Sequence, residues 1–147
     1  MSLRYLILGA GGIGGALGAH MLRGGLEVSF LARGRQLDAL TRDGLRLDKP
    51  GEHFSLGPVR ARSAETWAGE ADVIFLCVKG YSLEETIPFL RRAAGRNTAV
   101  IPLLNLPDTG DRLREALSAP PVTSGCIYIA SELASPVISS CGEASSG

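Results

Sequence analysis

The sequence has few cysteines, no excess of either charge and no long apolar run. Its three cysteines, Cys77, Cys126 and Cys141, are odd in number and show no C-x-x-C or other metal-ligand spacing, so neither a disulfide framework nor a metal site is expected. Fifteen basic residues balance fifteen acidic ones, which gives no reason to expect nucleic acid or an anionic membrane as a partner. No segment reaches the roughly 18 uninterrupted apolar residues of a membrane span. The apolar start also lacks the basic leader and cleavage site of a signal peptide. These absences predict a soluble protein of the reducing cytoplasm.

The length and the composition favour one domain. A chain of 147 residues can bury a core without help from disulfides or metals. Residues 1–147 contain no internal repeat, and low complexity is confined to residues 139–147, so we expect a flexible tail over about 141–147. In that tail only Cys141 could be reactive, whereas Cys77 lies in an apolar run and is expected in the core.

The most informative stretch is residues 4–22, which reads RYLILGAGGIGGALGAHML. Residues 5–8 form a short apolar run that is typical of a buried parallel strand. Three glycines follow at the spacing G-x-G-x-x-G, and a helix is expected to continue from them as far as the glycine pair at 24–25. Its predicted buried stripe recurs every four residues, at Ile13, Leu17 and Met21. A strand, a glycine turn and a helix in immediate succession are the context that a dinucleotide-binding fingerprint requires.

Each glycine of this fingerprint has a physical task. Gly9 allows a tight turn out of the strand, Gly11 has no Cβ that would hold a pyrophosphate away, and Gly14 lets the helix lie close to the sheet. The phosphates would then lie on N–H groups at the positive end of the helix. We therefore predict a nucleotide site, rather than a merely close-packed turn, at Gly9, Ala10, Gly11, Gly12, Ile13 and Gly14.

The end of the predicted second strand, residues 27–32, indicates the type of cofactor. A site for NAD usually places an acidic residue there to accept hydrogen bonds from the ribose 2′-hydroxyl. This chain has Arg33 instead, and Glu27 lies at the wrong end of the strand. A guanidinium would hold the 2′-phosphate of NADP(H) through charge-assisted bonds, and no carboxylate is expected beside it to repel the phosphate. The alternative interpretation is a solvated loop arginine.

The remaining pattern alternates helices and strands. A helix carrying Leu37 and Leu40 is expected after Arg33, and residues 44–62 alternate around Pro50-Gly51 as in a hairpin, which we expect at the edge of the sheet. Residues 63–68 predict a short helix capped by Ser63 and packed down by Trp67. Residues 71–78 are apolar on both faces, as in a central strand.

The second half continues the same alternation. Ser82 and Glu85 form a capping box for a helix with buried Leu83, Ile87 and Leu90, in which Pro88 predicts a kink. Residues 98–104 predict a strand in which Pro102 indicates an irregularity or an edge position. Asp108 can cap a helix that carries Leu113 and Leu117, and residues 122–130 and 136–140 predict a final hairpin that closes the sheet.

Alternating strands and helices with the glycine turn first predict an α/β fold with a doubly wound, mostly parallel sheet and an added β-hairpin. In such sheets ligands bind beyond the carboxyl ends of the strands. The glycine turn, Arg33, Lys79 and Asn105 all follow predicted strands. We therefore expect them at one edge of the sheet, although Lys79 alone could be a solvated lysine and Asn105 alone a cap or turn residue.

These segments together resemble the ketopantoate reductase family. The likeness rests on GAGGIG at 9–14, LARG at 31–34, VKGY at 78–81, the turn at Asn105 and GCIYIASEL at 125–133. It covers nearly the whole chain. Two departures stand out: family members usually have Asn-Gly where this chain has Asn105-Leu106-Pro107, and the family continues into a helical second domain with its proton-donating lysine.

The resemblance implies an NADP-binding Rossmann domain that lacks the family's helical carboxyl-terminal domain. It implies NADP(H) as the cofactor, with residues 9–14 on the pyrophosphate and Arg33 on the 2′-phosphate. Lys79 and Asn105 would face the nicotinamide and a small keto acid, as the catalytic candidates, and the backbone near Ala130 or Ser131 would help to seat the cofactor. The family reduces 2-dehydropantoate to pantoate, on the route to pantothenate and coenzyme A. No residue here is assigned the proton donor's role, so little turnover is expected from this chain by itself.

Three alternatives remain open at this stage. One is another NADP-dependent 2-keto acid reductase. A second is a non-catalytic nucleotide-sensing module and a third is a methyltransferase, both of which usually carry an acidic residue where this chain has Arg33. The sequence also leaves open whether two copies of the chain form a homo-oligomer.

Overall fold

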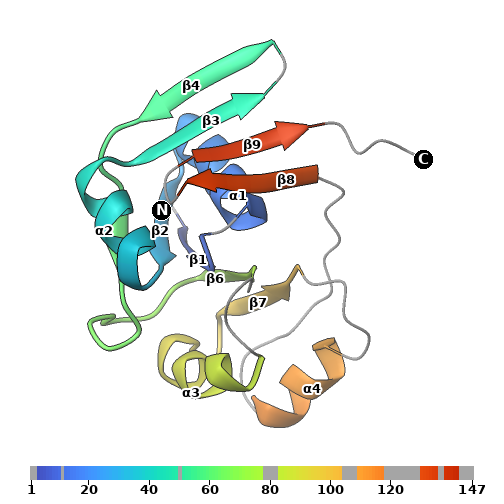
Figure 1. The fold of residues 1–147 in the computed structure, drawn as a ribbon. Helices are drawn as coiled ribbons and strands as arrows, with labels where there is room; N and C mark the ends of the chain where they lie inside the picture. The colour runs from blue at the N-terminus through green and yellow to red at the C-terminus, as the bar shows by residue number, and fades with distance from the viewer. Residues whose placement is uncertain are drawn as a thin grey trace.

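A parallel sheet of five strands forms the centre of the computed structural model, which describes residues 3–10, 12–49, 51–77, 83–103, 109–117, 130–135 and 138–142 (Figure 1). Its strand order is β5-β2-β1-β6-β7, and each neighbouring pair is parallel. The strands are β1 (Arg4–Leu8), β2 (Glu27–Leu31), β5 (Arg60–Arg62), β6 (Val73–Leu76) and β7 (Ala99–Pro102). This order, with helices in the crossovers from β1 to β2, from β2 to β5 and from β6 to β7, confirms the predicted doubly wound fold. Pro102 lies on an edge strand, as predicted.

Alternate residues of the sheet face two different cores. Leu6 and Leu8 of β1 contribute to a cluster with the helices α3 and α4, while Ile7 contributes to a cluster with α1. Neighbouring side chains of a strand point to opposite faces, so β1 is buried on both sides. The helices are α1 (Gly12–Arg23), α2 (Gly34–Arg42), α3 (Leu83–Ala93), which continues through Pro88, and α4 (Thr109–Ala116).

A second sheet of four strands lies on the α1 side, which corrects two predictions. Its order is β4-β3-β9-β8, and it is made of β3 (Leu45–Lys49), β4 (Glu52–Leu56), β8 (Ala130–Ser135) and β9 (Ile138–Gly142). The predicted hairpin β3–β4 exists, but it does not extend the edge of the main sheet. The final hairpin pairs β8 with β9 instead of residues 122–130 with 136–140, and it does not close the main sheet. Residues 122–129, 136 and 137 lie outside the described residues. Strand β3 pairs in parallel with β9, and α1 packs against β3, β8 and β9 as well as against the main sheet (Figure 1).

Three predictions about short segments are also wrong. Residues 60–62 do not belong to the hairpin, because they pair with β2 and bury Ala61 between two exposed arginines. Residues 63–68 form a turn rather than a helix, closed by the bond from the Trp67 N–H to the Ser63 carbonyl oxygen (3.0 Å). Trp67 nevertheless packs down, with its ring edge-on to Phe89. Residues 141 and 142, expected in the tail, are part of β9.

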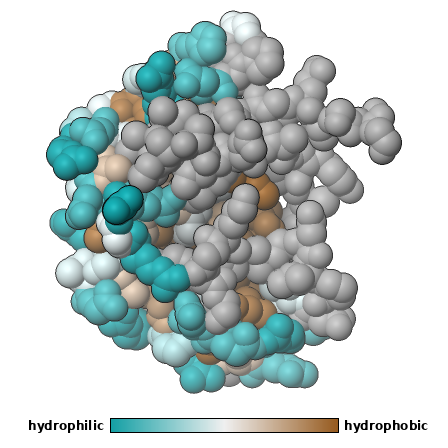
Figure 2. Space-filling view, in the orientation of Figure 1, coloured by the Kyte–Doolittle hydropathy of each residue, from teal (hydrophilic) through white to brown (hydrophobic). Residues whose placement is uncertain are grey.

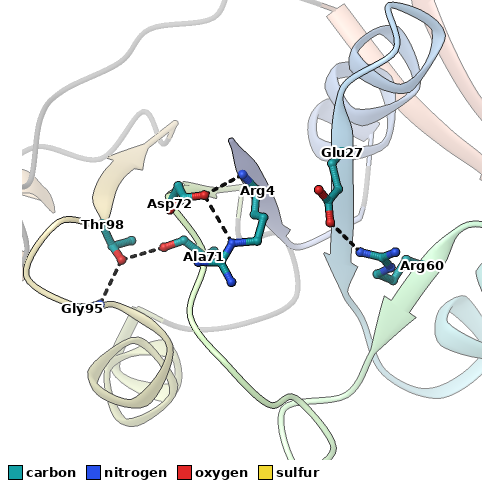
Figure 3. A network of polar contacts seen from close by, with 7 residues as sticks. All are labelled: Arg4, Glu27, Arg60, Ala71, Asp72, Gly95 and Thr98. Atoms are coloured by element: carbon teal, nitrogen blue, oxygen red, sulfur yellow. Dashed lines mark hydrogen bonds and ion pairs between the residues drawn. The ribbon is translucent and has the colours of Figure 1, made fainter. Parts of the chain in front are cut away.

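Polar side chains close the amino edge of the main sheet (Figure 3). The Asp72 carboxylate accepts bonds from the Arg4 backbone N–H (2.7 Å) and from Arg4 Nε (3.3 Å). Arg60 Nη1 donates to Glu27 Oε1 at 2.9 Å, which joins the starts of β5 and β2. Glu27 therefore supports the edge opposite to the predicted nucleotide site.

The buried Thr98 hydroxyl links three segments at the same amino edge. It donates to the Ala71 carbonyl oxygen at 2.6 Å and accepts the Gly95 N–H at 2.9 Å. Thr98 precedes β7 and Ala71 precedes β6, so this one side chain ties the approaches to two neighbouring strands (Figure 3).

The described surface is mainly hydrophilic in the view of Figure 2. Leu3 and Leu26 are the large hydrophobic residues that are exposed in the part of the chain that the structure describes. No helix within those residues is long and apolar enough to cross a membrane.

Candidate nucleotide-binding site

The turn after β1 has the backbone that the first glycine was predicted to supply. Gly9 has a φ of +97°, a conformation that residues with a Cβ rarely adopt. Its N–H donates to the Leu31 carbonyl oxygen (3.2 Å) and continues the pairing of β1 with β2. The Gly9 N–H is therefore engaged, and the N–H groups without a partner inside the helix are those of the first turn of α1.

Gly14 fixes how closely α1 approaches this turn. A Cβ at Gly14 would lie 2.0 Å from the Gly9 carbonyl oxygen and 3.0 Å from Ile7 Cγ2. The obstacle is backbone, so it cannot move aside without changing the turn itself. The close approach predicted for the third glycine is confirmed.

The face of α1 that packs on the main sheet consists of small residues, which the sequence analysis missed. The predicted stripe of Ile13, Leu17 and Met21 is only half-buried. Gly18, four residues after Gly14, lies against the sheet, because a Cβ there would come within 2.3 Å of the Phe30 ring. The G-x-x-x-G spacing of residues 14–18 was the available signal for this close packing.

A side chain from α2 holds the carbonyl group of the turn. Gln36 Nε2 donates to the Ala10 oxygen at 2.6 Å, and Ala10 itself is buried. This bond occupies a backbone acceptor that would otherwise be free to face a bound anion. Gln36 was not predicted to take part in the site, since glutamine in a helix carries no distinctive signal.

Arg33 lies two residues beyond β2, at the edge of the sheet where β1 also ends. Its backbone is extended (φ −145°, ψ 160°) and it precedes α2. Its side chain is 58% exposed, and Nη1 lies 3.5 Å from Glu85 Oε2 in the first turn of α3. The structure thus brings Arg33 to the edge that carries the glycine turn. The expectation that no carboxylate stands beside it is wrong, because Glu85 reaches it from α3, a different element.

Several predicted site residues lie outside the described residues. These are Gly11, Lys79 and Asn105, together with Ser82 and Asp108 of the predicted caps. Gly12 and Ile13 begin α1, as the fingerprint requires. Ala130 begins β8 in the second sheet, where its backbone pairs with Gly142. The predicted contact of Ala130 with a cofactor stays a prediction.

Cys77 follows β6 and is confirmed as a core residue. Burial raises the pKa of its thiol to about 12, so the thiol is neutral and a poor nucleophile. Within the described residues, no group of three or more histidine, cysteine, aspartate or glutamate residues could hold a metal ion.

A family model and several known proteins match this chain. A model of the family "Ketopantoate reductase PanE/ApbA" matches residues 5–142. The chain is 30% identical over 131 residues to the uncharacterized oxidoreductase YkpB of Bacillus subtilis. The aligned part covers 89% of this chain and 43% of that protein. It is 36% identical over 104 residues to the 2-dehydropantoate 2-reductase of Mesorhizobium japonicum, and the aligned part covers 70% of this chain and 32% of that protein. The chain therefore spans less than half the length of these two relatives.

Solved structures show the same fold. The 2-dehydropantoate 2-reductase of Porphyromonas gingivalis aligns with a TM-score of 0.85 and 33% identity, over 97% of this chain and 52% of that one. The ternary structure of D-mandelate dehydrogenase with NADH and anilino(oxo)acetate has a TM-score of 0.85 at 19% identity, covering 95% and 45%, which indicates a shared fold alone. With a family match across almost its whole length, the chain belongs to the ketopantoate reductase family.

Proposed function

We propose that this chain binds NADPH as the cofactor domain of an oxidoreductase that reduces 2-dehydropantoate to pantoate. The observation that carries the proposal is the glycine turn. A Cβ at Gly14 would meet backbone at 2.0 Å, and Gly9 adopts a positive φ. Together they bring the amino end of α1 against the end of β1, which is the geometry that holds a diphosphate.

The described residues fit the diphosphate of a dinucleotide. The first turn of α1 offers backbone N–H groups and the positive end of the helix dipole. The Ala10 carbonyl, which would repel an anion, is engaged by Gln36. The glycines leave no side chain between these donors and the phosphates.

Arg33 supports NADPH rather than NADH. It stands at the end of β2, where an enzyme for NAD places an acidic residue. Its side chain is more than half exposed, so a 2′-phosphate could approach it from solvent. A charge-assisted bond from arginine to phosphate is stronger than one between neutral groups.

Family membership supports the choice of reaction. It favours a reductase over a non-catalytic nucleotide-sensing module or a methyltransferase. Bound NADPH would supply hydride to the ketone carbon of a small keto acid. By family resemblance, Lys79 and Asn105 would face the reacting groups and orient the keto acid.

The test measures how strongly Arg33 discriminates between the two nicotinamide cofactors. Calorimetric titration of Arg33→Gln should show NADPH binding weakened about 10- to 100-fold, the value of a hydrogen bond to a charged group, with NADH nearly unchanged. Arg42→Gln is the matched control, because it removes the same charge from the last residue of α2, the helix that Arg33 precedes, where Arg42 pairs with Asp43. Equal losses for both cofactors in Arg33→Gln would refute the assignment of the phosphate site.

A thermal-shift comparison tests the ligand class independently. A ligand that binds only the folded chain raises its melting temperature. NADPH should raise it more than NADH does, and S-adenosylmethionine should leave it unchanged. Stabilisation by S-adenosylmethionine alone would overturn the proposal in favour of a methyltransferase.

A further inference from the structure

The contact between Arg33 and Glu85 spans the edge of the sheet at which β1 ends. Arg33 follows β2, and Glu85 lies on α3, the helix that follows β6. β2 and β6 are not neighbours, because β1 runs between them. The two side chains therefore reach toward each other from the two sides of the glycine turn.

A dinucleotide bound as proposed would have to use the same guanidinium. With its diphosphate on the turn after β1 and its 2′-phosphate on Arg33, the adenosine end would lie between β2 and the start of α3. The Glu85 carboxylate already lies 3.5 Å from Arg33 Nη1. A carboxylate and a phosphate are both acceptors for the same donors, and their like charges repel.

We propose that Glu85 is a specificity-determining residue that competes with the 2′-phosphate for Arg33 and lowers the preference of this site for NADPH over NADH. This inference rests on the proposed function. NADPH must displace the carboxylate from Arg33, whereas NADH has no phosphate to place there. The exposure of the two side chains, 58% and 54%, sets the size of the effect, since an exposed ion pair is weak and is screened by salt.

The neighbouring residue Glu84 provides a matched control. It lies in the same first turn of α3, but its carboxylate pairs with Arg112 rather than with Arg33. Glu84→Gln and Glu85→Gln remove the same charge from the first turn of α3, and glutamine at position 85 can still complete the capping box predicted with Ser82. A difference between the two variants therefore reports the contact with Arg33.

The experiment measures dissociation constants of NADPH and NADH for the 147-residue chain and its variants. Glu85→Gln should bind NADPH about three- to fivefold more tightly than wild type at low salt, which is what an exposed pair can contribute. NADH affinity should be unchanged, and so should both affinities in Glu84→Gln. The gain should fade between ionic strengths of about 0.01 M and about 1 M, where the screening length falls from roughly 30 Å to roughly 3 Å.

Two results would overturn the inference and a third would overturn its premise. Weaker NADPH binding in Glu85→Gln would mean that Glu85 positions Arg33 instead of competing for it. An equal response in Glu84→Gln would mean that only net charge matters. If Arg33→Gln leaves the ratio of the NADPH and NADH affinities unchanged, the phosphate site itself is wrong. If Arg33→Gln does change that ratio, Glu85→Gln should raise the NADPH affinity much less in the Arg33→Gln variant than it does in wild type.

Discussion

At the amino edge of the five-stranded sheet, polar side chains bond to one another and to backbone, whereas at the carboxyl edge the turn that begins at Gly9 joins β1 to α1. The side chains of Asp72 and Thr98 each take part in two hydrogen bonds at the amino edge (Figure 3). At the carboxyl edge Gly9 and Gly14 bring backbone against backbone. The exposed Arg33 and Glu85 stand on either side of that turn. The difference is the one that the proposed function expects, because ligands of parallel α/β folds usually bind beyond the carboxyl ends of the strands.

The largest expected effect comes from adding one methyl group at the carboxyl edge. Gly14→Ala places a Cβ 2.0 Å from the Gly9 carbonyl oxygen, so the helix must retreat from the turn. Overpacking costs typically about 1–3 kcal/mol, and the diphosphate cradle is distorted as well. NADPH binding should fall about 100-fold, which corresponds to roughly 2.7 kcal/mol, as measured by calorimetric titration alongside urea unfolding.

Gly57→Ala is the control for that variant. A Cβ at Gly57 would meet no atom within 4 Å, so both stability and binding should stay near wild type. If Gly14→Ala binds NADPH as tightly as wild type does, the close approach of α1 to the turn has no role in binding. The proposed difference in function between the two edges is then wrong.

The sequence predicted the elements that create this contrast because their signals are local. The glycine spacing and the apolar run of residues 5–8 identified the strand, turn and helix, and Arg33 was placed at the end of β2. The parallel pairing of the strands in the main sheet followed from the alternation of strands and helices. These inferences need no knowledge of which distant segments meet.

The errors arose where distant segments decide the outcome. Residues 45–49 read as a hairpin strand, but nothing local states that β3 pairs with β9, about ninety positions later. The small-residue face of α1 was missed although its G-x-x-x-G spacing is local, because the position of α1 between two sheets depends on distant segments. In that position Ala16 and Ala19 are buried more deeply than Leu17. Contacts such as Gln36 with Ala10 and Arg33 with Glu85 join separate elements and leave no mark on sequence spacing.

An intermediate effect is expected from Thr98→Val at the amino edge. The substitution keeps the shape but removes the hydroxyl that serves the Ala71 carbonyl and the Gly95 N–H. Leaving buried polar groups without a partner costs about 1–3 kcal/mol, so the unfolding midpoint in urea should fall, while the affinity for NADPH should not change. Thr98→Ser keeps both bonds and should lose less stability. A loss of NADPH affinity in Thr98→Val, with the fold intact, would show that the two edges are not independent.

The smallest expected effect concerns Asp72 and depends on pH. The Arg4 backbone N–H, and then the Arg4 side chain, hold the pKa of the Asp72 carboxyl below its ordinary value of 3.8. A carboxyl whose pKa is lowered by folding stabilises the protein above its unfolded pKa, and this contribution disappears as the pH falls through the folded pKa. Asp72→Asn should therefore be less stable than wild type near neutral pH, and the two should converge below about pH 4. Asp43→Asn, which removes an exposed carboxylate paired with the adjacent Arg42, is the control and should track wild type across the same range. A constant difference between wild type and Asp72→Asn at every pH would mean that the charge of Asp72 plays no part, and that the amino edge relies on its neutral bonds.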